Sequence, residues 1–446
     1  MARYTKQQIL NNAEEENVRY IRLMFTDING TIKSVEIPVG RLKSALEGEI
    51  MFDGSSIEGF ARLMEADMYL KPDFNTWLVQ RWEKTAYGKV GRLICDAYTS
   101  EHEPAPVDPR VNLKRIIKKM EDMGFSNLNI GFEPEFFLFK MDENGKITNE
   151  VTDNGGYFDL SPIDDAGECR RDIVLELERI GFTMEASHHE VAPGQNEINF
   201  QFSNVLEACD NIQTFKLVAK NVAKRHSLHA SFMPKPIEGI NGSGMHAHCS
   251  INDWDGHNVF SDPDDPKGLS KTCRQWLTGL ITHAKGFCAL TNPTVNSYKR
   301  LVPGFEAPCY ISWSEKNRSV MIRIPLTRGE KTRTEIRNID TSANPYLAMA
   351  AVLSAGLDGI EHDFTPIDSV DANMFEKTPE ERQALGVENL PSNLKEAVIA
   401  MTEDPLMKEA LGEHIYHKFI DLKMLEWHDF SKFVTNWEIE RYKRLI

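Results

Sequence analysis

Polar and apolar residues alternate in several short segments of the chain, and this period of two predicts strands with one polar face. In the segment 131–137, Gly-Phe-Glu-Pro-Glu-Phe-Phe, Glu133 and Glu135 fall on one face while Phe132 and Phe136 take the other. The alternation recurs in further segments, whose polar members are Glu197, Asn199 and Gln201; His246, His248 and Ser250; and Arg333, Glu335 and Arg337. Several such strands predict a polar concave interior, such as a barrel mouth or funnel.

Glu133 and Glu135 carry like charges two residues apart, with no positive residue beside them in the sequence. Such a pair must be solvated, partly protonated or bound to a cation. A single glutamate is usually solvated or ion-paired, and a single histidine such as His246 is usually an ordinary core or surface residue. The case for a site therefore depends on the set. Carboxylates with an occasional imidazole suit Mg²⁺ or Mn²⁺ better than zinc.

A group of arginines lies close together in the sequence among apolar residues: Arg300, Arg318, Arg323, Arg333 and Arg337. Such arginines can bind phosphate or carboxylate with paired hydrogen bonds, or they can be surface residues that pair with an acidic background. Divalent metals together with arginines indicate a nucleotide phosphate chain, yet the chain contains no P-loop and no kinase loop set. The residues alone indicate a metal-dependent enzyme that handles ATP and an anionic substrate.

A proline-rich break at residues 104–109 predicts the boundary between two domains, 1–105 and 106–446. The first reads as a small α+β domain, in which we expect a helix over 9–18, a hairpin over 20–37, a polar glycine loop at 51–56, and strands at 76–79 and 93–97. In the second we expect helices over 113–123, 170–180 and 205–227, a helix from Pro345 to about Gly359 that Asn344 caps, and a loop-rich stretch over 366–392.

Composition excludes several classes of function. A formal charge of −16 and a pI near 5.4 argue against a nucleic-acid scaffold, whose footprint is basic. The start of the chain has no apolar signal region, and no run of 18 apolar residues appears, so we expect no membrane association. The seven cysteines are scattered singly without a Cys-x-x-Cys pair, which fits a reducing cytoplasm.

The chain resembles type I glutamine synthetase along essentially its whole length. The matching motifs are Asp53-Gly-Ser-Ser, Glu133-Pro-Glu135, the segment 188–194 (His-His-Glu-Val-Ala-Pro-Gly), the segment 241–246 (Asn-Gly-Ser-Gly-Met-His), the segment 292–304 from Asn-Pro-Thr to Val-Pro-Gly, Asn317-Arg318-Ser and Asn344-Pro-Tyr. Each motif is weakly to moderately specific alone, but their order and spacing together leave little room for chance.

The resemblance implies an α+β fold: a small N-terminal β-grasp-like domain and a large catalytic domain whose curved antiparallel sheet, a half-barrel funnel, is flanked by helices. It also implies two metal sites, one held by Glu135, Glu190 and Glu197 and the other by Glu133, His246 and Glu335. The implied glutamate contacts are Asn241, Gly242, Arg300 and Arg337, and the implied ATP contacts are Glu185, His248, Ser250, Arg318, Arg323 and Arg333. Asp53 from a neighbouring subunit would take a proton from ammonium, Glu306 would lie on a flap, and Ser56 and Tyr157 match positions near the ammonium pocket.

The implied reaction joins ammonia to L-glutamate in two steps, through γ-glutamyl phosphate, with ATP as co-substrate and two or more Mg²⁺ or Mn²⁺ ions per site. Family members form dodecamers of two stacked hexameric rings. The chain resembles the shorter bacterial α subclass, in which glutamine feedback is typical, and Arg62 matches a position linked to that feedback. Some type I enzymes are adenylylated on a tyrosine in a C-terminal loop, but this sequence has no tyrosine between Tyr346 and Tyr416, so we expect no such control.

Three alternatives stay open at this stage. A γ-glutamyl-amine ligase that uses a polyamine or another amine is the nearest rival, and the presence of Asp53 and Glu306 favours ammonia. A relative that has lost catalysis would have lost metal ligands, and every predicted ligand is present. A nitrogen-responsive transcription regulator, which some Gram-positive relatives bind, would be an additional partner.

Overall fold

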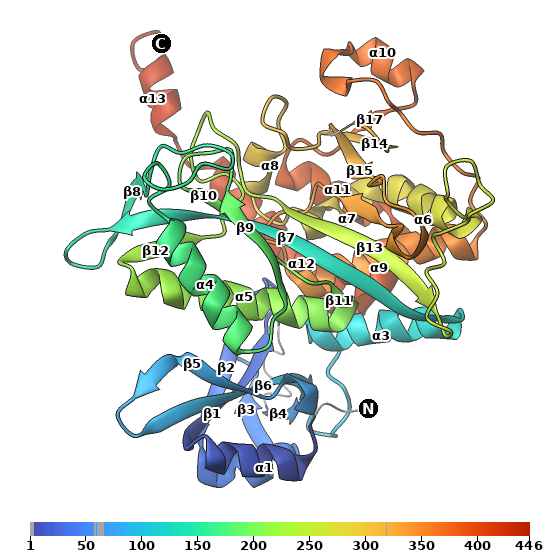
Figure 1. Cartoon of the computed structure of the whole chain (residues 1–446). Coiled ribbons are helices and arrows are strands. Elements are labelled where there is room, and N and C mark those ends of the chain that lie inside the picture. Colours follow the sequence, from blue (N-terminus) through green and yellow to red (C-terminus); the bar gives the residue numbers. More distant parts are fainter. Residues whose placement is uncertain (1–3, 58, 60–66, 318) are drawn as a thin grey trace.

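The first hundred residues build a small sheet with a hydrophobic core of its own (Figure 1). The computed structural model describes residues 4–57, 59, 67–317 and 319–446. The strand order is β2-β1-β6-β4-β3, β5 also pairs with β6, and β1 and β6 run parallel. The elements are α1 (Lys6–Glu15), β1 (Val18–Thr26), β2 (Ile32–Pro38), η1 (Val39–Arg41), α2 (Leu42–Leu46), β3 (Ile50–Asp53), β4 (Asp67–Pro72), η2 (Phe74–Thr76), β5 (Leu78–Thr85) and β6 (Gly88–Tyr98).

The structure confirms the hairpin predicted over 20–37, because β1 and β2 pair antiparallel around the turn. Three other expectations in this part were wrong in their bounds. The first helix spans Lys6–Glu15 rather than 9–18, because Thr5 and Gln8 form a capping box that begins it. Asp53 ends strand β3 rather than lying in a loop, and the strand expected at 76–79 begins only at Leu78.

A larger sheet forms the centre of the remaining chain, in the order β17-β14-β15-β16-β13-β7-β10-β9, with β8, β11 and β12 also paired to β7. Its strands are β7 (Phe125–Met141), β8 (Ile147–Val151), β9 (Met184–His189), β10 (Gln195–Phe200), β11 (Ser203–Asn204), β12 (Leu228–Ser231), β13 (Met245–Asp253), β14 (Tyr310–Ser314), β15 (Val320–Arg323), β16 (Thr334–Ile336) and β17 (Glu388–Asn389). The long strand β7 lies between β13 and β10, and apart from the parallel pair β14–β15 the described neighbours run antiparallel.

Helices cover this sheet, and α3, α4 and α5 lie between it and the N-terminal sheet (Figure 1). The helices are α3 (Pro109–Asp122), α4 (Gly167–Arg179), α5 (Val205–Arg225), α6 (Lys271–Thr282), α7 (Ala284–Thr291), α8 (Ser297–Arg300), η3 (Gly329–Lys331), α9 (Pro345–Glu361), η4 (Met374–Glu376), α10 (Pro379–Ala384), α11 (Leu394–Glu403), α12 (Pro405–Ser431) and α13 (Asn436–Tyr442). The four expected helices are therefore confirmed within a few residues, and Asn344 caps α9 as expected. The architecture is the expected α+β fold.

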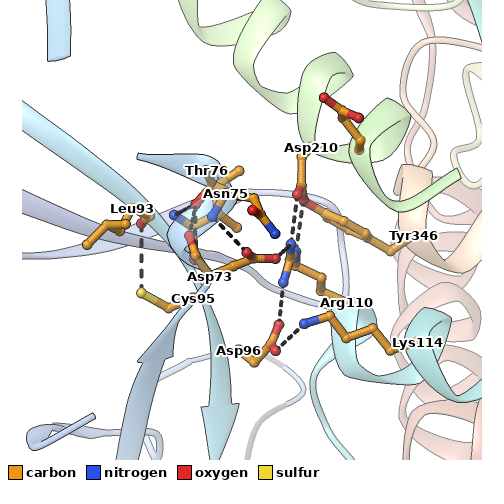
Figure 2. Close-up of polar contacts among 12 residues, drawn as sticks. Asp73, Asn75, Thr76, Leu93, Cys95, Asp96, Arg110, Lys114, Asp210 and Tyr346 are labelled. Atoms are coloured by element: carbon orange, nitrogen blue, oxygen red, sulfur yellow. Dashed lines mark hydrogen bonds and ion pairs between the residues drawn. The ribbon is translucent and has the colours of Figure 1, made fainter. Parts of the chain in front are cut away.

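A buried ion cluster joins the two parts of the chain (Figure 2). Arg110, near the start of α3, donates to three carboxylates: Asp73 and Asp96 at 2.7 Å each, and Asp210 at 2.9 and 2.8 Å. Tyr346 on α9 also donates to Asp210, at 2.7 Å. Because Asp73 and Asp96 come from the N-terminal sheet and Asp210 from α5, this Arg110 cluster fixes one part against the other.

All seven cysteines are buried and unpaired. Among the described residues, no helix combines the length and the apolar character that a membrane crossing needs.

Candidate active site

Side chains from β7, β9, β10, β13 and β16 meet in a cavity of about 550 Å³. The strand register brings these side chains together, because residues directly opposite each other in antiparallel strands lie on the same face of the sheet. His246 lies opposite Glu133, and Glu197 lies opposite Glu135. The lining residues are Glu133, Glu135, Tyr157, His188, Glu190, Val191, Gln195, Glu197, Asn199, Asn241, Gly242, His246, Arg300, Phe305, Glu306, Ala307, Arg323, Glu335 and Arg337.

On the β13 side of the cavity, Glu133, His246 and Glu335 form one acid–histidine set. The Nδ1 atom of His246 lies 3.4 Å from Glu133 and 3.5 Å from Glu335, and one ligand atom from each residue fits within 4.8 Å of the others. Burial alone would raise the pKa of Glu133, but hydrogen bonds to His246 and His248 hold it well below its usual value. The set predicted for one metal site is therefore brought together.

On the β10 side, Glu190 and Glu197 lie together with His188, again with one ligand atom from each residue within 4.8 Å of the others. Glu135 lies beside them, and its carboxylate accepts hydrogen bonds from Gln195 Nε2 at 2.9 Å and from the Gly244 backbone N–H at 3.0 Å. The second predicted set, Glu135, Glu190 and Glu197, thus shares one wall of the cavity, and His188 joins it.

Crowded carboxylates on this side resist ionisation. Burial, followed by repulsion from Glu197 and Glu190, raises the pKa of Glu135 to about 8. Burial and repulsion from Glu197 raise the pKa of Glu190 to about 7. Because these carboxylates titrate together, the cluster keeps protons at neutral pH unless a bound cation replaces the protons.

The two acid sets fit divalent cations. Their donors are carboxylate oxygens with one imidazole in each set, a combination that suits Mg²⁺ or Mn²⁺. The pKa values of Glu135 and Glu190 are raised because these groups are buried and because the carboxylates of this wall repel one another. The described side chains around them supply too little positive charge to offset that repulsion. A cation between these carboxylates would supply that charge.

Three arginines line the cavity next to the acids. Arg323 and Arg337 both contact Glu335, the latter at 2.7 Å. Arg300 is buried, and its guanidinium donates to the backbone carbonyls of Asn338 at 2.8 Å and Arg337 at 3.1 Å. Three guanidinium groups therefore lie beside a row of acids, an arrangement that can bind an anion bridged to cations.

His248 and Arg333 lie directly behind the first acid set. Arg333 Nε donates to His248 Nδ1 at 3.2 Å, so the proton of a neutral His248 lies on Nε2, which is 2.9 Å from Glu133. Ser250, two residues further along β13, accepts a hydrogen bond from Asn129 at 3.5 Å. None of these three predicted ATP contacts lines the cavity as the described residues outline it.

The segment 302–308, here called the flap, closes one side of the cavity next to the loop 240–243. Asn241 Nδ2 donates to Glu306 Oε2 at 3.2 Å, and Glu306 has a left-handed backbone with φ 58°. In the loop, a Cβ atom at Gly242 would lie 2.1 Å from the Pro234 carbonyl oxygen, so this position needs glycine. On the other side of the cavity, the Tyr157 ring contacts the His188 ring edge-on at 5.6 Å.

Three further predicted residues, Asp53, Ser56 and Glu185, lie outside this cavity. Asp53 is exposed at the end of β3, where it accepts a hydrogen bond from Ser55 N at 2.8 Å, and Ser56 is exposed beside it. Glu185 is exposed on β9. Arg62 and Arg318 lie outside the described residues, so their predicted roles are not addressed by the structure.

Three polar residues that line the cavity, His188, Gln195 and Asn199, were given no role in the prediction, although the alternation placed Asn199 on a polar strand face. The alternation that identifies Glu197 extends to Gln195 and Asn199, and the same spacing connects Glu190 with His188. The two-residue alternation along these strands could therefore have identified all three residues. Phe305, by contrast, is brought to the cavity by the flap, for which the sequence has no periodic signal.

Comparisons with known proteins agree over the whole chain. Residues 17–100 match the family described as "Glutamine synthetase, beta-Grasp domain", and residues 106–442 match "Glutamine synthetase, catalytic domain". The chain is 56% identical over 441 residues to glutamine synthetase of Staphylococcus aureus strain Mu50, covering 99% of this chain and 98% of that protein. It is also 56% identical over 439 residues to the Staphylococcus epidermidis strain RP62A glutamine synthetase, covering 98% of each.

Solved structures show the same likeness. A GmaS/ADP complex aligns with a TM-score of 0.88 and 32% identity, covering 98% of this chain and 99% of that chain. Glutamine synthetase of Plasmodium falciparum, solved by cryo-electron microscopy, aligns with a TM-score of 0.87 and 23% identity over 99% of each chain, which supports the fold.

Proposed function

Since the chain belongs to the glutamine synthetase family, we propose that its cavity joins ammonia to L-glutamate at the expense of ATP, giving L-glutamine, ADP and phosphate. The chain is an enzyme of the ligase class, a glutamate–ammonia ligase. One observation carries the proposal most strongly. Glu133 belongs to one acid–histidine group, its neighbour Glu135 on β7 lies opposite Glu197 of a second group, and both groups line a single cavity that also contains arginines.

Divalent cations, Mg²⁺ or Mn²⁺, would be held by Glu133, His246 and Glu335 in one site and by Glu135, Glu190 and Glu197 in the other. When bound, they would neutralise phosphate charge that would otherwise repel an attacking carboxylate. The residues proposed to contact ATP are Glu185, His248, Ser250, Arg318, Arg323 and Arg333. GmaS, a solved relative, was determined as a complex with ADP, which supports a nucleotide as a substrate of this fold.

In the first step, the γ-carboxylate of glutamate attacks the γ-phosphorus of ATP, forming a new P–O bond while the bond to ADP breaks. Asn241, Gly242, Arg300 and Arg337 are proposed to hold the glutamate, and Arg318 and Arg323 to stabilise charge on the transferred phosphoryl group. Burial of Arg300 and its two hydrogen bonds to backbone carbonyls support its assignment, because a fixed guanidinium in a dry site binds a carboxylate strongly.

In the second step, ammonia attacks the carbonyl carbon of γ-glutamyl phosphate, the C–O bond to phosphate breaks, and amide and phosphate form. Asp53 of a neighbouring subunit is proposed to accept the proton that ammonium loses, with Ser56 and Tyr157 near the ammonium pocket. The exposure of Asp53 outside its own chain's cavity is compatible with delivery to a neighbour. Glu306 is proposed to close the site, which matters because water would hydrolyse the acyl phosphate.

For assembly and control, we propose a homododecamer of two hexameric rings in the cytoplasm. We also propose the α subclass, with glutamine feedback that involves Arg62 and without adenylylation, since no tyrosine lies between Tyr346 and Tyr416. Binding of a feedback-inhibited form to a nitrogen-responsive transcription regulator is a further part of the proposal, to be tested separately.

A coupled phosphate-release assay tests the function. With ATP, glutamate and Mg²⁺, ammonium should support turnover and added glutamine should reduce it, whereas putrescine should give no more than background. Turnover with putrescine that equals or exceeds turnover with ammonium would overturn the proposal in favour of a γ-glutamyl-amine ligase.

A further inference from the structure

Lys235 is a buried cation next to the cavity that none of the proposed roles uses. Its side chain is only 9% exposed, although it does not line the cavity itself. Its backbone is fixed by two hydrogen bonds with the Asn296 side chain, at 2.8 Å from Lys235 N and 2.9 Å to Lys235 O. The position of the side chain therefore depends on what surrounds the ammonium group.

The ammonium group of Lys235 contacts both sides of the cavity entrance. Nζ donates to the carbonyl of Ile240, the residue before Asn241 in the loop 240–243. Nζ also lies 3.7 Å from the centroid of the Phe305 ring, and Phe305 precedes Glu306 in the flap. Lys235 thus connects the loop that holds Asn241 with the flap that holds Glu306.

The charge of Lys235 has no other evident use. Among the residues that the structure describes, no carboxylate pairs with its ammonium group, whose contacts are the Ile240 carbonyl and the Phe305 ring, and its charged neighbour Arg300 repels it. A buried ammonium without a counterion is costly unless its partners attract the charge. An aromatic face provides such attraction, and the attraction is greatest where water is excluded.

The flap itself needs support from its surroundings. Glu306 adopts φ 58°, a region that non-glycine residues visit rarely, and its described side-chain contact with the loop is the single 3.2 Å hydrogen bond from Asn241. Phe305 is the adjoining flap side chain that reaches the cavity, and its ring is the one that Lys235 contacts. The Lys235–Phe305 contact is therefore placed to hold this backbone in position.

We propose that Lys235 is a positioning residue that holds the flap closed through the Phe305 ring and so keeps water from the acyl phosphate. The inference rests on the proposed function. If the flap is released, water attacks the carbonyl carbon of γ-glutamyl phosphate, the C–O bond to phosphate breaks, and glutamate and phosphate are regenerated. ATP is then consumed without glutamine being made.

The test compares phosphate released with glutamine formed, at saturating ammonium, in Lys235→Met, Phe305→Leu and Phe305→Tyr. Met keeps the length and apolar stem of Lys235, Leu removes the aromatic face, and Tyr retains it. The wild-type enzyme and Phe305→Tyr should release about one phosphate per glutamine. In Lys235→Met and Phe305→Leu, phosphate release without glutamine should rise roughly tenfold, as expected for loss of a desolvated cation–π contact.

A matched control is Lys71→Met, because Lys71 lies 4.7 Å over the ring of Tyr98 in the N-terminal sheet, far along the chain from the flap. This variant should keep the wild-type ratio. Hydrogen exchange of the segment 302–308 gives a readout independent of turnover, and it should be faster in Lys235→Met than in the wild-type enzyme. Because Phe305 is half-buried, Phe305→Leu tests the contact even if Lys235→Met folds poorly.

The outcomes separate this inference from the function on which it rests. If the wild-type enzyme forms no glutamine from ATP, glutamate and ammonium, the proposed function fails. If the wild-type enzyme is active and both Phe305→Leu and Lys235→Met keep the ratio near one, the positioning role of Lys235 is overturned, whatever happens to the KM for glutamate.

Discussion

Replacing Glu135 by glutamine tests whether a divalent cation compensates the crowded acids of the cavity. The amide oxygen of the variant can still accept the hydrogen bonds from Gln195 and Gly244, at 2.9 and 3.0 Å, so the substitution removes a charge with little change of shape. Glu135 is only 9% exposed, so solvent screens this charge weakly.

The sign of the pH effect follows from the raised pKa of Glu135. A value of about 8 against 4.5 for the ordinary group means that, without a cation, the folded protein binds more protons than the unfolded chain between these values. Its contribution to stability is therefore present at low pH and lost as pH rises toward 8. For this one group, the loss between pH 6 and pH 8 is about 2 kcal/mol.

Thermal unfolding at pH 6 and pH 8, in EDTA and in millimolar Mn²⁺, measures both effects. In EDTA, the wild-type melting temperature should fall between pH 6 and pH 8, and the fall should be smaller in Glu135→Gln. Mn²⁺ should stabilise the wild-type protein more at pH 8, where fewer protons must be displaced. It should stabilise the variant much less, because losing a ligand should weaken affinity by roughly 100-fold or more.

Glu150→Gln, a change at an exposed position on β8, is the control and should behave like the wild-type protein throughout. Equal stabilisation of Glu135→Gln and wild-type protein by Mn²⁺ would refute the assignment of Glu135 to a cation site. A wild-type melting temperature in EDTA that does not change between pH 6 and pH 8 would refute the reasoning about crowded carboxylates.

Three further predictions address other parts of the structure. Arg110→Met leaves the carboxylates of the Arg110 cluster without their buried partner. The free energy of unfolding measured by urea titration should fall by about 3–5 kcal/mol, and a loss below about 1 kcal/mol would contradict the structural role of the cluster. Gly242→Ala forces the loop away from the Pro234 carbonyl and should raise the KM for glutamate at least about tenfold. An unchanged KM would argue against that loop as the glutamate contact. Glu335→Gln should lower ATP turnover at saturating Mg²⁺ by at least roughly 100-fold, and near-normal turnover would exclude Glu335 as a ligand.

Strand periodicity predicted much of the site, because each strand of the cavity has one buried apolar face and one polar face. Glu133 with Glu135 and Glu197 with Asn199 are pairs of alternate positions that line the cavity, whereas on β13 only His246 does so and His248 and Ser250 do not. What periodicity could not predict is which strands become neighbours. The pairing of Glu133 with His246 and His248 depends on β13 lying beside β7, more than a hundred residues later, and it changes Glu133 from an isolated acid into a firmly ionised one.

The predicted ends of helices and strands were wrong where local hydrogen bonds determine where an element begins. The first helix begins at Lys6 because Thr5 and Gln8 cap it, a signal that hydrophobic spacing does not contain. The strand expected at 76–79 starts later because η2 occupies Phe74–Thr76, with Asp73 accepting from Asn75 N at 3.0 Å. Long-range contacts such as Arg110 with Asp210 and Lys235 with Phe305 have no sequence signal, since each depends on the packing of separate elements.

Transfer of ¹⁸O from glutamate to phosphate tests whether the γ-carboxylate of glutamate is phosphorylated by ATP. If the γ-carboxylate of glutamate attacks ATP, then glutamate labelled with ¹⁸O in that carboxylate must pass one labelled oxygen to each phosphate released during glutamine formation. We expect one ¹⁸O per phosphate in the wild-type enzyme with ammonium. Glutamine formed together with unlabelled phosphate would contradict phosphorylation of the γ-carboxylate and the mechanism proposed for this cavity.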